Sequence, residues 1–200
     1  IGGGNFGDTY VADVEIGKRT RKFVIKKFKE FNNLSPQDHA LRAMENYNAA
    51  KEAKLKVFPT YRLSEDKESI LMTSADLEKN YCVDRREEIK EGELGIERIR
   101  QFEDLVTAVL SEAIKAGKAS VAVYMSAYFF LVDRKTKTRV DFVIGDLDDV
   151  KKDTDTPVSE IIQSNLDFAR MALIAFLNNN VEDFQKYARR LQQIYDTMKK

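Results

Sequence analysis

The chain has 200 residues, which suffices for one large domain or two small lobes. Its apolar content of 43% is ample for a folded core, and 33 acidic residues balance 33 basic ones. Because domains that bind nucleic acid usually carry a basic excess, we expect no nucleic-acid partner. Apolar runs of membrane-spanning length and a signal peptide are both missing, so we expect no membrane partner.

The single cysteine, Cys82, excludes an internal disulfide. A lone thiol fits a reducing compartment, and we expect a cytoplasmic protein. An incidental thiol is a better interpretation of Cys82 than a nucleophile.

A glycine-rich stretch opens the chain, where Gly2, Gly4 and Gly7 form a G-x-G-x-x-G pattern. Glycines allow backbone N–H groups to approach phosphates, but several unrelated loops use them, and many are merely turns. A dinucleotide-binding loop would open a helix. Residues 8–16 instead favour a strand because they are rich in β-branched and aromatic side chains.

A second predicted strand, 21–29, contains the run Phe-Val-Ile-Lys that ends at Lys26. A glycine loop followed by a strand lysine is typical of the kinase nucleotide site, so the chain resembles the protein-kinase-like superfamily. The resemblance implies that Lys26 pairs with the α- and β-phosphates of ATP. Because Lys27 and Lys29 are neighbours, a solvated strand lysine is the alternative, although Lys26 shares its face with Val24 and not with Lys27.

A helix follows this strand pair, with Ser35 as N-cap and Pro36 in the first helical position. Its expected apolar stripe consists of Leu41, Met44, Glu45, Asn48, Glu52 and Leu55. The resemblance implies an ion pair between Lys26 and a glutamate of this helix, for which Glu45 is the first choice and Glu52 the competitor. A surface position for Glu45 is the alternative.

Residues 57–63 and 69–73 predict a second strand pair, which completes a small lobe. The stretch 70–77 resembles a strand that runs into a hinge at 74–77. By resemblance, Met72 is the gatekeeper, and backbone groups of Thr73 and Ala75 hydrogen-bond the adenine. We interpret 78–98 as a loop or lid.

The rest of the chain predicts a mainly helical lobe. We expect a helix over 99–116 that Gly117 ends, strands over 128–133 and 139–144, a buried helix over 157–177, and a last helix after Asn180.

A second resemblance lies at Ile144-Gly145-Asp146-Leu147, which is similar to the kinase sequence Ile-Gly-Asp-Phe-Gly. It implies that Asp146 holds magnesium. Asp148 replaces the last glycine and adds a second carboxylate, and carboxylates in such a cluster favour a hard cation. An acidic turn after a strand is the alternative.

The usual catalytic loop is missing. Family members carry an Asp that accepts the substrate proton and an Asn that holds a second Mg²⁺. The matching positions here are Tyr124 and Phe129. We therefore expect no catalytic residues of the usual kind. By resemblance, Asp167 would brace this loop from the buried helix.

The prediction is an α+β, two-lobed, protein-kinase-like fold. Residues 1–73 form a small antiparallel-sheet lobe with one helix, 74–77 form the hinge, and 78–200 form a reduced, mainly helical large lobe. Because the chain starts inside a motif, we expect further residues before Ile1.

The resemblance implies an ATP- and Mg²⁺-binding pseudokinase, acting as a nucleotide-dependent switch or scaffold through a protein partner. One alternative is an atypical phosphotransferase or nucleotidyltransferase that uses the acidic cluster. The other is an interaction module that binds no nucleotide.

Overall fold

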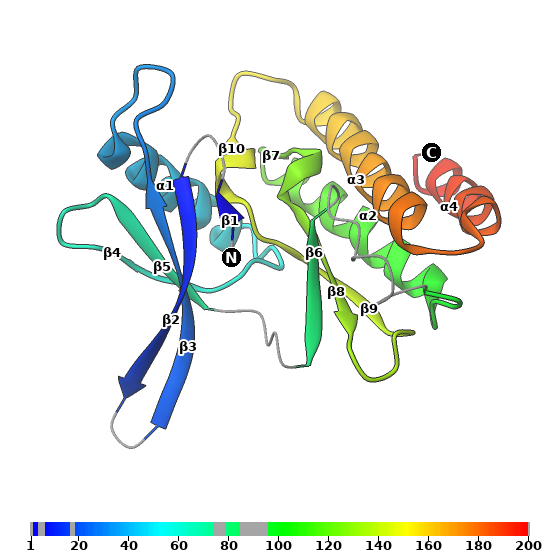
Figure 1. Ribbon diagram of the computed structural model, residues 1–200. Helices are drawn as coiled ribbons and strands as arrows, with labels where there is room; N and C mark the ends of the chain where they lie inside the picture. The colour runs from blue at the N-terminus through cyan, green and yellow to red at the C-terminus, as the bar shows by residue number, and fades with distance from the viewer. Residues whose placement is uncertain (1, 4–6, 17–18, 74–78, 85–95, 200) are drawn as a thin grey trace.

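The computed structural model describes residues 2–3, 7–16, 19–73, 79–84 and 96–199. Two groups of elements are visible in Figure 1. A five-stranded antiparallel sheet and one helix form the small lobe, while three helices and short strands form the large lobe. This is the predicted α+β arrangement.

The small-lobe sheet has the strand order β1-β2-β3-β5-β4. Its strands are β1 (Gly2–Gly3), β2 (Gly7–Ile16), β3 (Arg19–Phe28), β4 (Thr60–Leu63) and β5 (Ser69–Thr73). Gly2 lies opposite Thr9 in an antiparallel pair, so the glycine pattern connects two strands and does not open a helix, as predicted. A Cβ added at Gly7 would lie 2.3 Å from the Lys27 carbonyl oxygen, so the sheet itself requires this glycine.

Helix α1 (Pro36–Glu52) begins with a capping box, in which the Ser35 hydroxyl accepts from the Asp38 amide and the Asp38 carboxylate accepts from the Ser35 amide. Its buried face differs from the predicted stripe: it consists of His39, Ala40, Ala43, Asn46, Tyr47 and Ala50. Leu41 and Glu45 are exposed. Small alanines on the inner face let the helix approach the sheet closely. Their packing decides which face is buried, and the prediction, which followed the larger apolar residues, was therefore wrong.

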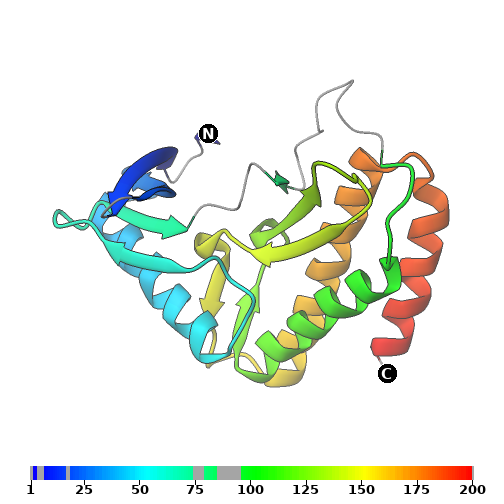
Figure 2. The same cartoon turned by 90° about the horizontal axis from the view of Figure 1, so that it is seen from below.

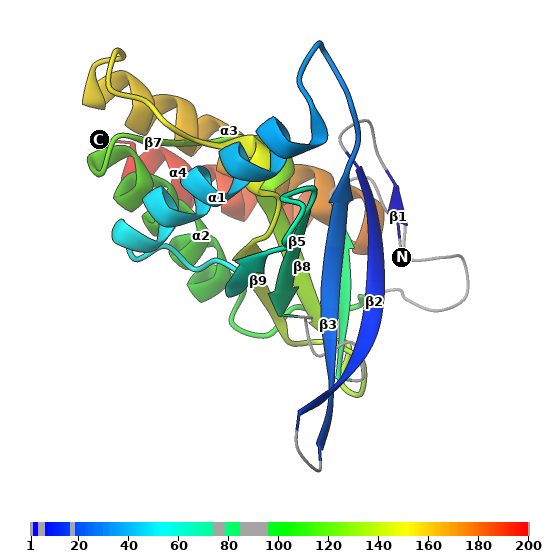
Figure 3. The same cartoon turned by 90° about the vertical axis from the view of Figure 1, so that its left-hand side faces the viewer.

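A small core cluster lies between α1 and the sheet (Figure 3). Phe28 and Ile70 come from the sheet, and Ala40, Ala43 and Tyr47 come from the helix. Leu147, from the other lobe, completes the cluster and is only 5% exposed. The core of the small lobe therefore depends on a side chain that enters it from the large lobe.

In the large lobe, the helices α2, α3 and α4 pack against one another (Figure 2). They span α2 (Phe102–Lys118), α3 (Val158–Asn180) and α4 (Phe184–Met198). A three-stranded sheet has the order β6-β8-β9, and β7 pairs with β10. The strands are β6 (Asn80–Asp84), β7 (Val121–Val123), β8 (Tyr128–Asp133), β9 (Val140–Ile144) and β10 (Val150–Lys152), with 3₁₀ turns at η1 (Met125–Ala127) and η2 (Leu147–Asp149).

Two sequence expectations fail in this lobe. Part of the predicted loop at 78–98 is strand β6, in which Cys82 pairs with Leu131 of β8. Helix α2 also continues through Gly117 instead of ending there. A Cβ at Gly117 would lie 2.6–2.9 Å from atoms of Ile162, so this glycine permits close packing of α2 on α3.

The predicted hinge at 74–77 lies outside the described residues, and the division at that point stays a prediction. Within the described part of the chain, none of the helices combines the length and apolar character needed to cross a membrane.

Candidate functional site

Lys26 projects from the middle of the small-lobe sheet, where β3 lies between β2 and β5. Its neighbours in register are Thr9 and Ile70. The Lys26 side chain is only 17% exposed, and its ammonium lies 5.4 Å from the centre of the Phe28 ring. A cation in such a position needs an anionic partner, because burial removes most of its hydration.

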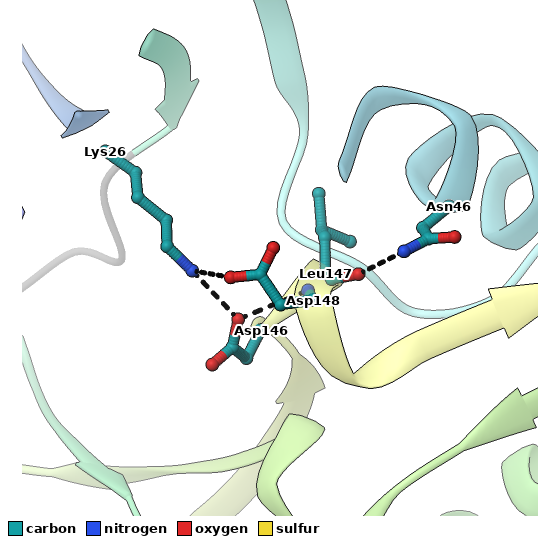
Figure 4. Close-up of polar contacts among 5 residues, drawn as sticks. All are labelled: Lys26, Asn46, Asp146, Leu147 and Asp148. Carbon is teal, nitrogen blue, oxygen red and sulfur yellow. Dashed lines mark hydrogen bonds and ion pairs between the residues drawn. The ribbon is translucent and has the colours of Figure 1, made fainter. Parts of the chain in front are cut away.

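Two carboxylates supply that partner (Figure 4). Lys26 Nζ lies 3.0 Å from Asp146 Oδ1 and 2.5 Å from Asp148 Oδ2. The Asp146 side chain is 30% exposed, whereas that of Asp148 is 9% exposed. The structure thus brings together the strand lysine and both predicted metal ligands, across a sequence separation of more than a hundred residues.

The three groups perturb one another's ionisation. Burial by itself lowers the pKa of Lys26, but the charges of Asp146 and Asp148 and the hydrogen bonds to them outweigh it, and the pKa lies above its ordinary value. Burial raises the pKa of Asp148, and the nearby charge of Asp146 adds to this, against the opposing effect of Lys26. One ammonium therefore compensates two closely spaced carboxylates incompletely.

The turn at residues 145–149, here called the aspartate turn, is fixed from several sides. The Gly145 amide donates to the Ala127 carbonyl at 2.8 Å. A Cβ at Gly145 would lie 2.7 Å from the Phe129 ring and 2.9 Å from the Phe58 ring, so only glycine fits there. Asp146 Oδ1 accepts from the Asp148 amide at 3.3 Å and caps η2.

Helix α1 also holds this turn, through a residue that the sequence did not single out. Asn46, 7% exposed, donates from Nδ2 to the Leu147 carbonyl at 2.8 Å. Figure 4 shows Asn46 approaching the turn from the side opposite Lys26. The helical burial pattern, with Ala43, Asn46 and Ala50 on one face, is the signal that could have identified it.

Glu45 does not take the predicted place. Its side chain is exposed, and the contacts of the described residues include no ion pair between Glu45 and Lys26. Adjacent helical positions lie about 100° apart, so a buried Asn46 places Glu45 away from the sheet. The competitor Glu52 is exposed as well.

The other predicted nucleotide contacts are only partly described. Gly4 and Ala75 lie outside the described residues, whereas Gly2 lies in β1. Met72 packs against the small-lobe core. The Thr73 amide and hydroxyl both donate to the Pro59 carbonyl, so of its backbone groups only the carbonyl could accept from an adenine.

Aromatic side chains stand at the two positions where the family resemblance predicts an Asp and an Asn. The Tyr124 side chain is 42% exposed, and its ring lies 5.3 Å from that of Phe168. Its amide donates to the Asp149 carbonyl at 2.9 Å, next to the β7–β10 pair. Phe129 lies in β8, against Gly145. Neither position offers a carboxylate or an amide to a substrate.

The segment before Tyr124 is braced by Asn165 and not, as predicted, by Asp167. Asn165 is fully buried; its Oδ1 accepts from the Val123 amide at 2.9 Å, and its Nδ2 donates to the carbonyls of Val121 at 2.8 Å and Ala113 at 3.2 Å. Asp167 instead accepts from the Tyr195 hydroxyl. The two residues lie on different faces of α3. Asn165 is on the buried face and Asp167 is not, and the sequence did not reveal which face is buried.

Two open hollows, of about 520 and 800 Å³, lie near the start of α2, away from Lys26. The larger one is lined by charges of both signs, and Arg190 and Glu103 already pair there at 2.7 Å. These hollows lack the convergence of buried charges seen at Lys26.

No protein-family model and no curated protein sequence matches the chain. Among solved structures, the ADP/Mg²⁺-phosphoaspartate complex of the Rio2 kinase from Chaetomium thermophilum superposes with a TM-score of 0.60 at 10% identity, over 98% of this chain. This chain spans 64% of that Rio2 chain. A double mutant of the PknI kinase domain from Mycobacterium tuberculosis gives a TM-score of 0.45 at 11% identity, over 98% of this chain and 93% of that one. Likeness at such identities concerns the fold alone.

Replacing Lys26 with methionine should destabilise the protein by about 2 kcal/mol near neutral pH, because Asp148 would lose its buried counter-charge. A raised carboxyl pKa means that the folded state binds more protons than the unfolded state, so the stability it contributes is lost as pH rises through the folded pKa. Lys26→Met raises that pKa further, and its cost should therefore be greater at neutral pH than at mildly acidic pH. Urea unfolding measures the loss of stability and its change with pH.

The control variant Lys29→Met, which removes an exposed ion pair with Asp8, should cost under about 0.5 kcal/mol. A cost of Lys26→Met that does not change with pH would contradict this account.

Asn165→Asp should destabilise the protein by about 3 kcal/mol near neutral pH, because the new carboxylate would face two carbonyl oxygens without a proton to donate. Acid should restore part of the stability, since protonation returns a donor. Asp167→Asn is the matched control, expected to cost under about 1 kcal/mol because its oxygen can still accept from Tyr195. Chemical unfolding at neutral and at acidic pH provides the test. If Asp167→Asn loses more stability than Asn165→Asp, the bracing role of Asn165 is rejected.

Proposed function

We propose that this chain, which has the protein-kinase-like fold, is an ATP-binding pseudokinase that acts as a nucleotide-dependent switch or scaffold. The observation that carries the proposal is the convergence of Lys26, Asp146 and Asp148 in a part-buried position where the two lobes meet. Tyr124 and Phe129 stand where the acceptor-side machinery would be. The site thus retains groups suited to phosphates and lacks a base for an acceptor hydroxyl.

In this proposal, the loop between Gly2 and Gly7 covers the phosphates and Lys26 contacts the α- and β-phosphates. Met72 borders the adenine, which the Thr73 carbonyl and backbone groups of Ala75 bind. The strand pairing on both sides of the loop supports this placement, because it is the arrangement in which a glycine loop can fold over a ligand.

The carboxylates fit a magnesium ion that arrives with the nucleotide. Mg²⁺ is usually held by one or two carboxylates together with substrate phosphates, and it does not need a cage of protein ligands. Asp146 is suited to this, because it is 30% exposed and the described contacts engage only its Oδ1. Asp148 is the second candidate ligand. Bound Mg²⁺ would supply positive charge between the phosphates and these carboxylates.

The proposed switch role is based on the contacts that connect the aspartate turn to both lobes. Asn46 connects the turn to α1, and Leu147 completes the small-lobe core. A nucleotide that contacts Lys26 directly, and Asp146 through its magnesium ion, would act on a turn that both lobes hold. We propose that a protein partner senses this change, that the protein is cytoplasmic, and that residues 74–77 are the hinge between the lobes.

ATP with magnesium should stabilise the protein by about 2.7 kcal/mol at about one hundred times its dissociation constant. Lys26→Ala should remove most of this gain, and Asp146→Asn should weaken binding mainly when magnesium is present. Lys29→Ala is the matched control, since that lysine pairs with Asp8 at the surface. Thermal shift and calorimetry measure these effects. If millimolar ATP gives no shift, the nucleotide proposal fails and the interaction module replaces it.

A second candidate is an atypical transferase that phosphorylates its own carboxylate. The Rio2 structure is described as a phosphoaspartate complex, which makes this chemistry relevant to a similar fold. A carboxylate carries no proton, so it needs no general base. The oxygen of Asp146 would attack the γ-phosphorus while the bond to the bridging oxygen breaks and ADP leaves.

Incubation with γ-labelled ATP and magnesium should give no label on protein hydroxyls, because Tyr124 stands where a carboxylate base would be needed. Label that hydroxylamine removes would establish the carboxyl phosphate, and borohydride reduction followed by mass spectrometry would locate it. Hydroxyl label lost in Asp148→Asn or Asp149→Asn would replace the pseudokinase proposal with an atypical kinase. In a parallel incubation with α-labelled ATP, label that arrives from the α-phosphate but not from the γ-phosphate would identify nucleotidyl transfer.

A further inference from the structure

Of the two ion pairs that Lys26 makes, the one with Asp148 is the closer and the more buried. Asp148 Oδ2 lies 2.5 Å from Lys26 Nζ, against 3.0 Å for Asp146 Oδ1. The Asp148 side chain is 9% exposed, less than a third of the exposed fraction of Asp146. Charge-assisted hydrogen bonds are stronger than neutral ones, and poor access of water strengthens them further.

The backbone that carries Asp148 is held before any ligand binds. Its amide donates to Asp146 Oδ1 at 3.3 Å, and the preceding residue, Leu147, is both buried in the small-lobe core and bonded through its carbonyl to Asn46. The Asp148 carboxylate is therefore presented to Lys26 from a constrained turn, which lowers the entropy lost on pairing.

Helix α1 offers Lys26 no such partner. Glu45 is exposed, and the buried place beside it belongs to Asn46, whose amide reaches the turn and not the lysine. The helix thus holds the turn, and the turn holds the lysine.

We infer that Asp148 is the positioning residue for Lys26 and replaces the helix glutamate that the family resemblance predicted for that role. The inference rests on the proposed nucleotide role of Lys26 and divides the work between the two carboxylates. Asp148 anchors the ammonium, and the more exposed Asp146 faces the metal-bound phosphates. An ammonium has three N–H groups, so two bonds to the carboxylates leave one for a phosphate oxygen.

Anchoring can be tested without any ligand by a double-mutant cycle on urea unfolding. The variants are Lys26→Met, Asp148→Asn and the double variant, with a second cycle between Lys26→Met and Glu45→Gln. Contacting residues give non-additive losses, and distant ones give additive losses. We expect the double variant of Lys26 and Asp148 to lose little more than the larger single loss, and the losses in the Glu45 cycle to add. Additive losses in the Asp148 cycle would overturn the inference.

The functional arm measures how much Lys26 contributes to ATP affinity in each background, by calorimetry with EDTA so that no divalent metal takes part. Lys26→Met should weaken ATP binding about tenfold in the parent and only about twofold in Asp148→Asn, because an unanchored lysine contributes little. The loss should stay at about tenfold in Glu45→Gln and in Asp148→Glu, which keeps the carboxylate. A merely structural role of Asp148 would leave this ratio unchanged.

The outcomes separate the two claims. If the contribution of Lys26 is the same in the parent and in Asp148→Asn, Asp148 does not position it. If the contribution increases in Asp148→Asn, the carboxylate competes with phosphate, and the inference is equally overturned. If the parent binds no ATP, the proposed function fails, while the ligand-free cycle still decides whether Asp148 anchors Lys26.

Discussion

One ammonium shared by two carboxylates is the interaction on which this molecule depends. Lys26 leaves the centre of the small-lobe sheet and meets Asp146 and Asp148 where the large lobe approaches it. Charges this poorly hydrated are stable only when paired, so the contact fixes the distance between a strand and a turn that are remote in sequence. Because two anions face one cation, the site also has a residual attraction for a further positive charge.

The turn that bears these aspartates joins the two lobes mechanically. Gly145 lets it pass between two aromatic rings, Asn46 bonds its backbone, and Leu147 is inserted into the small-lobe core. A change at Lys26 therefore reaches the helix, the sheet and the large lobe through direct contacts. The switch that we propose would use these contacts, since coupling needs an element that both sites can bias.

The segment around Tyr124, where the family resemblance predicts catalytic groups, is held by several hydrogen bonds. Asn165 satisfies three backbone groups around it, and β7 pairs with β10 beside the aspartate turn. In the pseudokinase that we propose, such a segment would serve as a recognition surface. The exposed Tyr124 ring packs against Phe168 and presents an aromatic group there.

The sequence by itself indicated the order of most helices and strands, the strand context of the glycine pattern and the capping of α1, and it singled out Lys26, Asp146 and Asp148, which the structure brings together. These depend on local propensities, on spacing and on a recognisable pattern, all of which are present in the sequence.

The sequence did not determine which face of α1 is buried. The alanines of α1 give a weak hydrophobic signal, and their packing on the sheet decides how the helix is rotated about its axis. For this reason we predicted a role for Glu45, whereas the neighbouring Asn46 is the buried residue that holds the turn. In α3, likewise, we predicted that Asp167 braces the segment before Tyr124, whereas Asn165 does so. Strand β6 and the close approach at Gly117 also needed the partner segments, since pairing and helix contact are properties of two elements at once. Only the tertiary structure decided that Asp148 lies against Lys26, because a charge pair between remote residues has no periodicity to reveal it.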